Sequence, residues 1–139
     1  MSSWDTGPFD NDGAMNFVAK LDHDDDERAT RRIQQAMRSV VESRDYISAA
    51  KMNLAIASAC LVGAMMGAHD AVGSPFVLDW LTVAKVRPTP ELCRLSLAVF
   101  ERAFSPVDNQ WFSLWESDGK LNRVRRGLAP FHKVLAAAA

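Results

Sequence analysis

The chain has 139 residues, of which 48% are hydrophobic and 24% are charged, the proportions of one ordinary globular domain that is large enough to bury a core. Its net charge of -1 excludes a general electrostatic attraction to nucleic acid or to an anionic membrane. Cys60 and Cys93 lack the paired spacing of a disulfide framework or a zinc site, so we expect both to be buried apolar residues.

A turn followed by a short helix is predicted at the start of the chain. Gly7 and Pro8 mark the turn, and Asp10 or Asn11 can accept hydrogen bonds from the free amides of the first helical turn. Apolar residues at helical spacing then form the inward face of this helix: Ala14, Phe17, Val18 and Leu21.

The acidic run around Asp10 and Asp12 also invites comparison with a calcium-binding loop. An EF-hand loop with its glycine at Gly13 would begin at Pro8 and end at Ala19, and neither of these side chains can bind calcium. We therefore expect this segment to cap a helix, and we expect no metal and no cofactor in the protein.

A second helix is predicted to begin near Asp24. Its first turn is acidic, which the helix dipole favours at a helix N-terminus. The apolar stripe of this helix consists of Ala29, Ile33, Ala36, Met37 and Val40. The arginines between these positions are expected to face water.

The segment from Ile47 to Ala68 is predicted to be the central helix of the fold. No residue between Met52 and His69 carries a formal charge, and a helix that is apolar on all sides is buried in a core or in a membrane. Small residues recur at every fourth position and predict a close helix contact along one row: Ala55, Ala59, Gly63 and Gly67. Much of the segment is Ala, Gly and Ser, with Asn53 inside it, so we expect a core helix and not a membrane span.

Three or four further helices complete the predicted fold. Ser74–Pro75 and Thr89–Pro90 are typical helix starts, Trp111 and Trp115 lie one turn apart on a short helix, and a last helix follows Asp118. We found no convincing strand. The prediction is therefore an all-α protein, residues 1–139 forming a single compact helical domain of about six helices around a buried, alanine-rich central helix.

Charge is distributed unevenly along the chain. Acidic residues crowd the first 27 positions, whereas no acid follows Asp118. Two candidate interaction faces result, one acidic (Asp24, Asp25 and Asp26) and one basic (Lys120, Arg123, Arg126 and Lys133). The alternative is that the two ends of the chain pack together and neutralise each other.

The segment WDTGPFDND resembles the opening of a bacterial family called domain of unknown function 4259, whose members begin W-G-x-G-x-F-D-N-D. The matching residues, which we interpret as structural, are Trp4, Gly7, Phe9, Asp10, Asn11 and Asp12. Tyr46-Ile47 before an alanine-rich helix and residues 114–118 (LWESD) before a final helix fit the same pattern. The resemblance implies a small helical domain and no established activity. Members commonly carry acids where this chain has Asn16, Lys51 and Cys60.

No catalytic residue is predicted. Nucleophile elbows, phosphate loops and metal-ligand spacings are missing from the sequence, and His69 beside Asp70 is more simply a helix end than a catalytic base with its partner. We therefore expect a small cytoplasmic protein-interaction module that is not an enzyme, with a toxin-neutralising immunity protein as one form of it. Self-association through faces of opposite charge is a further expectation. The alternative is a small-molecule-binding or enzymatic domain with a pocket at Trp111, Trp115 and Cys60, and nucleic-acid binding ranks below both.

Overall fold

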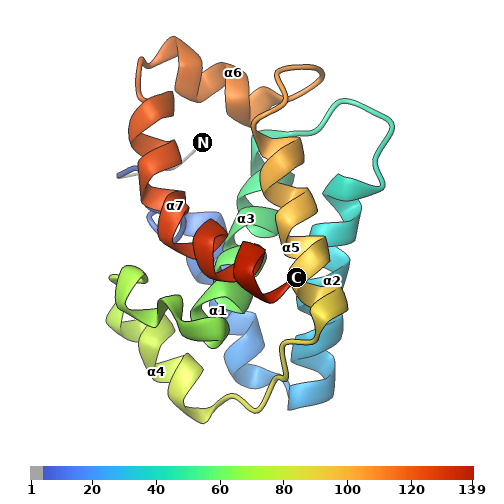
Figure 1. Cartoon of the computed structure of the whole chain (residues 1–139), viewed down its shortest axis with the longest axis vertical. Helices are drawn as coiled ribbons and strands as arrows, with labels where there is room; N and C mark the ends of the chain where they lie inside the picture. The colour runs from blue at the N-terminus through green and yellow to red at the C-terminus, as the bar shows by residue number, and fades with distance from the viewer. Residues whose placement is uncertain (1–4) are drawn as a thin grey trace.

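The computed structural model describes residues 5–139, and Trp4 of the opening motif lies outside the described residues. This part of the chain forms seven α-helices and no β-strand, which confirms the predicted all-α fold (Figure 1). The helices are α1 (Asp12–His23), α2 (Asp26–Val41), α3 (Ala49–Gly63), α4 (Pro75–Val83), α5 (Pro90–Ala103), α6 (Gln110–Ser117) and α7 (Leu121–Ala138).

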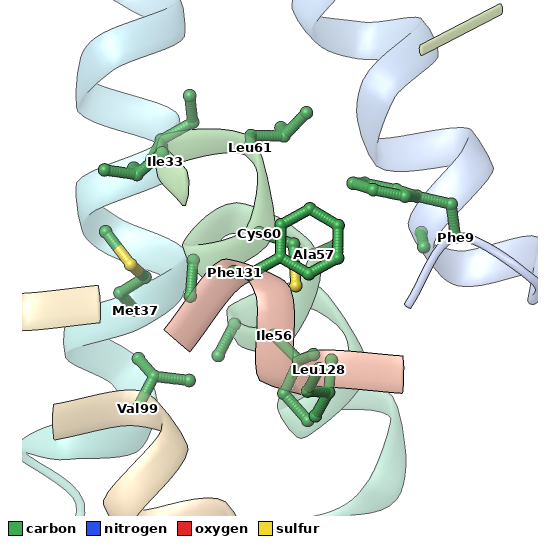
Figure 2. Close-up of a cluster of buried hydrophobic side chains, with 14 of the residues drawn as sticks. Phe9, Ile33, Met37, Ile56, Ala57, Cys60, Leu61, Val99, Leu128 and Phe131 are labelled. Atoms are coloured by element: carbon green, nitrogen blue, oxygen red, sulfur yellow. The ribbon is translucent and has the colours of Figure 1, made fainter. Parts of the chain in front are cut away.

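Helix α3 is the buried centre of the fold, as predicted. From Met52 to Gly63 every residue except Leu54 is buried. The helix packs against α1, α2, α5, α6 and α7, so its apolar faces are covered on all sides (Figure 1). Figure 2 shows Ala57, Cys60 and Leu61 of α3 among side chains from α2, α5 and α7. A helical segment from Ala49 to Ala71 is long and apolar enough to cross a membrane, but 72% of its most apolar stretch is buried inside the fold.

The central helix is shorter than the predicted range of residues 47–68. It begins after Ser48, whose side chain accepts a hydrogen bond from the Lys51 amide at 3.2 Å. The last part of the predicted range, Ala64–Ala68, follows α3 as a π-helical turn in which Gly67 has a φ of +127°. Only glycine adopts such a backbone angle without strain, so Gly67 ends the helix and does not continue the row of small residues.

Gly63 does mark a close helix contact, as the row of small residues predicts. A Cβ atom at this position would lie 3.1 Å from the Phe131 Cβ and 3.3 Å from the Phe131 Cα. The backbone of α7 therefore approaches α3 within a distance that a larger residue would prevent. This contact positions α7 over the core.

Side-chain caps begin six of the seven helices, which explains where the chain turns helical. The capping residues are Asn11, Asp25, Ser48, Ser74, Thr89 and Asn109. Asp25 and not Asp24 caps α2, so the helix begins two residues later than the predicted start. Helix α7 alone has no side-chain cap among the described helices.

Candidate functional site: a basic helix face beside an apolar groove

The opening motif builds the entry to α1. The Asp10 carboxylate accepts a hydrogen bond from the Gly7 amide at 3.0 Å, and Asn11 Oδ1 accepts one from the Ala14 amide at 2.8 Å. Phe9 is buried, and Figure 2 shows it pointing toward the core cluster. These contacts are those of a structural motif, and within residues 5–139 no group of three or more His, Cys, Asp or Glu side chains is placed to hold a metal ion.

The three carboxylates of the acidic candidate face are all engaged within the fold. Asp24 is paired with the Arg32 guanidinium at 2.7 Å, Asp25 accepts a hydrogen bond from the Arg28 amide at 2.8 Å, and Asp26 accepts one from the Lys85 amide at 3.0 Å. These contacts close the turn between α1 and α2 and tie it to the chain after α4. The acidic cluster therefore has a structural role.

The Asp24–Arg32 pair gives a testable pH dependence. Hydrogen bonds donated by Arg32 lower the pKa of Asp24. Because the folded pKa is lower than the unfolded one, the pair stabilises the fold above about pH 3.9, the usual pKa of aspartate, and this stabilisation is lost as the pH falls through the lower folded pKa. Asp24→Asn is expected to unfold more easily than wild type at neutral pH, with a difference that shrinks in acid.

Denaturant unfolding from neutral pH down to acid pH measures this difference. The control is Asp22→Asn, an exposed carboxylate on the last turn of α1, which is expected to change the free energy of unfolding by less than about 0.5 kcal/mol. A constant difference between wild type and Asp24→Asn across the acid range would contradict the assigned role of the pair.

The basic candidate face lies on the outer side of α7. Val124, Leu128, Phe131 and Leu135 are buried, whereas Arg126 and Lys133 are exposed on the opposite side of the helix. Arg123 is exposed on the flank next to them. Lys120 is exposed just before the helix. Within the described part of the chain, none of these four cations has a carboxylate oxygen within 4.0 Å.

No ion pair within residues 5–139 joins the acidic turn between α1 and α2 to the basic face of α7. In Figure 1 the turn between α1 and α2 lies at the lower end of the molecule, whereas α7 begins at the upper end beside α6. The ion pairs found in residues 5–139 join Glu27 to Arg31, Asp24 to Arg32, and His69 to Asp70. The positive charge of α7 is therefore left facing solvent.

A groove of about 630 Å³ runs between α5 and α7, next to the basic face. Its floor is formed by two apolar residues, Phe100 and Leu128, which are each only 3% exposed. The residues that line it are Leu97, Phe100, Glu101 and Phe104 of α5, and Arg125, Leu128, Ala129, His132 and Ala136 of α7. This volume lies within the range of small-molecule binding sites.

Three ionisable side chains surround the apolar floor of the groove. The Arg125 guanidinium lies over the Phe104 ring, 4.2 Å from its centroid, and the His132 ring meets the Phe100 ring edge to face with centroids 5.9 Å apart. Glu101 stands on the α5 side, with its carboxylate more than 4.0 Å from the cationic nitrogens of Arg125 and His132. Arg125 therefore has no acidic partner among the described residues.

Within residues 5–139, the structure has no ligand-sized pocket at Trp111, Trp115 and Cys60, where the sequence predicted one. Both tryptophans are buried, and the free space beside them is about 10 Å³, which is too small for a ligand. Cys60 is completely buried, and burial raises the pKa of its thiol far above the usual range, so it is a core residue. His69 and Asp70 are 61% and 98% exposed, which leaves them without the burial of a catalytic pair.

A family model for a domain of unknown function (DUF4259) matches residues 2–126. The chain belongs to the DUF4259 family. The match confirms the predicted family and spans α1 to the first part of α7, whereas Leu128, Ala129 and His132 of the groove lie beyond it. No curated protein and no solved structure matches the chain.

The fold of this DUF4259 protein thus brings together residues of two helices that lie more than 20 positions apart in the sequence. Arg125, His132, Phe100, Phe104 and Glu101 were not predicted as site residues. The spacing of Arg125, Ala129, His132 and Ala136 is one signal that was present, because positions i, i+4, i+7 and i+11 share one face of a helix.

Proposed function

We propose that this DUF4259 protein is a small cytoplasmic protein-interaction module that binds its partner through the basic outer face of α7. The observation that carries the proposal is the difference between the two charged regions. Asp24 is paired with a guanidinium, and Asp25 and Asp26 each accept a backbone hydrogen bond although they are exposed. Arg123, Arg126 and Lys133 face solvent with neither kind of contact among the described residues.

The chemistry of this face selects an acidic protein surface as the partner. From Lys120 to Lys133 the helix axis rises by roughly 20 Å, so the cations form an elongated strip. Complementary charge of this kind raises the association rate and excludes partners of the wrong sign. Neutralisation of a toxin with an acidic surface is one biological form of the proposal, and a toxin gene beside this gene would support it.

The test compares two charge-reversal variants of equal net charge. Arg123→Glu/Arg126→Glu changes the outer face of α7, and Arg44→Glu/Lys51→Glu makes the same charge change at two exposed residues outside α7. Partners are captured from nuclease-treated lysate of the native host, identified by mass spectrometry, and remeasured as purified proteins by calorimetry. We expect the α7 variant to bind the identified partner at least about tenfold more weakly, and the control variant to bind like wild type.

Equal binding by both variants would refute the proposed face. If untreated lysate instead yields nucleic acid whose binding weakens steeply with salt, the partner is a phosphate backbone and the protein-partner proposal is wrong. Sedimentation of the purified chain tests head-to-tail self-association, in which the basic face of α7 would meet the exposed carboxylates at the turn between α1 and α2 of a second copy.

A further inference from the structure

We propose that the groove between α5 and α7 is a binding site for an apolar monocarboxylate, a small molecule with a hydrocarbon body and one carboxylate group. This site is distinct from the basic outer face of α7 and does not depend on the proposed protein partner. The inference combines the size of the groove, its apolar floor and the placement of one unpaired guanidinium at its side.

The body of the ligand is indicated by the floor and walls of the groove. Phe100 and Leu128 form a floor that is almost completely shielded from water by the surrounding side chains, and Leu97 and Phe104 are half-buried. A space of about 630 Å³ with such a lining favours a hydrocarbon group, because the apolar ligand surface leaves water on binding.

The acidic group of the ligand is indicated by Arg125. Its guanidinium carbon lies 4.2 Å from the centroid of the Phe104 ring, a contact that favours this position and leaves the N–H groups available to a ligand. No carboxylate of the described residues lies within 4.0 Å of it. A guanidinium in this state is suited to donate two parallel hydrogen bonds to a carboxylate, and the His132 ring offers a further N–H at the same rim.

The number of negative charges on the ligand is limited by Glu101. Its carboxylate lines the same groove from α5 and repels anions there. The charges of Arg125 and Glu101 balance, so the described lining of the groove has no further positive charge to offset a second or third anionic group on the ligand. A monocarboxylate is therefore favoured over a dicarboxylate or a phosphate ester.

The test uses octanoate as the probe, octanamide as its uncharged analogue, and suberate as its dicarboxylate analogue. Amide chemical shifts of the full chain are followed by nuclear magnetic resonance during each titration. We expect saturable shifts at residues of α5 and α7 that line the groove with octanoate, and binding weaker by roughly tenfold or more with octanamide and with suberate.

Two neighbouring arginines on α7 provide a matched pair of variants. Arg125→Gln removes the guanidinium in the groove and is expected to weaken octanoate binding by roughly tenfold or more. Arg126→Gln makes the same charge change on the outer face and is expected to change it by less than about twofold. Glu101→Gln should strengthen octanoate binding and reduce the discrimination against suberate, and Ala129→Trp should block the groove.

The inference is overturned by any of three results. These are the lack of saturable shifts in the groove at millimolar octanoate, equal binding of octanoate and octanamide, and equal effects of Arg125→Gln and Arg126→Gln. Chemical shifts outside the groove and melting temperatures of the variants verify that each one is folded. Because Arg126 belongs to the proposed protein-binding face and Arg125 to the groove, failure of one proposal leaves the other intact.

Discussion

Replacing Asn109 with alanine is expected to lower the free energy of unfolding by about 2–4 kcal/mol, because it leaves two buried backbone groups, the Ala103 carbonyl and the Phe112 amide, without their partner. Asn109 is 1% exposed and lies between α5 and α6. Its side-chain amide lies 3.2, 2.8 and 3.0 Å from the carbonyl oxygens of Arg102, Ala103 and Ser105, and its Oδ1 accepts a hydrogen bond from the Phe112 amide at 3.0 Å. One side chain thus ends one helix and begins the next.

Denaturant unfolding measures the effect, and two further variants separate its parts. Asn109→Asp keeps the oxygen that caps α6 but loses the donor to the α5 carbonyls and buries a charge beside them, so this variant is also expected to lose stability. Asn122→Ala alters an exposed asparagine of α7 and is expected to change stability by less than about 0.5 kcal/mol. A loss below about 1 kcal/mol for Asn109→Ala would mean that water replaces the lost contacts.

The same residue also affects the proposed ligand site. The Asn109 contacts fix the end of α5, where Phe104 follows the last helical residue and carries the Arg125 guanidinium on its ring. The chain here is further held by a backbone bridge in which the Ile47 amide donates to Asp108 O at 2.9 Å and the Gln110 amide donates to Ile47 O at 3.1 Å. We therefore expect Asn109→Ala to weaken octanoate binding even though it does not line the groove.

The central helix was predictable from the sequence because its burial is encoded locally. An uncharged run that is apolar on every side has no face to present to water, so the sequence alone places α3 at the centre. Its end was not predictable in the same way. Gly63 and Gly67 look equivalent in the row of small residues, but one contacts α7 and the other adopts a φ of +127°.

The choice between the two charged faces could not be made from the sequence. Asp24 and Asp26 look as free as Arg123 and Arg126 when only their positions in the chain are known. Whether a carboxylate is engaged depends on contacts formed after folding, here with Arg32 in the second turn of α2 and with the backbone amide of Lys85, which is 59 residues from Asp26. The basic residues have no comparable contact in the described part of the chain.

The groove was missed because periodicity does not show how far a neighbouring helix covers a face. Leu97 and Phe104 belong to an apolar row of α5 that predicts deep burial. In the structure both are only half-buried, because α7 presents the small side chains of Ala129 and Ala136 along this row. Small residues on an exposed helix face leave space that large residues would fill.

Replacing Gly63 with leucine is expected to destabilise the protein by about 1–3 kcal/mol or more, because the new side chain has no space between α3 and α7. Its Cβ alone would lie 3.1 Å from the Phe131 Cβ and 3.3 Å from the Phe131 Cα. The second of these atoms belongs to the backbone of α7, which must move as a whole since it cannot turn aside like a flexible side chain. Because α7 also carries Arg125 and one wall of the groove, this movement is expected to weaken octanoate binding as well.

Gly127 provides the matched control, because it is a helical glycine of α7 at which an added Cβ atom would have open space, with no neighbouring heavy atom within 4 Å. Gly127→Ala should raise the free energy of unfolding by up to about 1 kcal/mol through helix propensity, and Gly127→Leu should be tolerated. Thermal and denaturant unfolding of the four variants Gly63→Ala, Gly63→Leu, Gly127→Ala and Gly127→Leu then separates crowding from propensity. If Gly63→Leu is as stable as wild type, α7 is free to move away from α3, and the close contact at Gly63 does not position the groove.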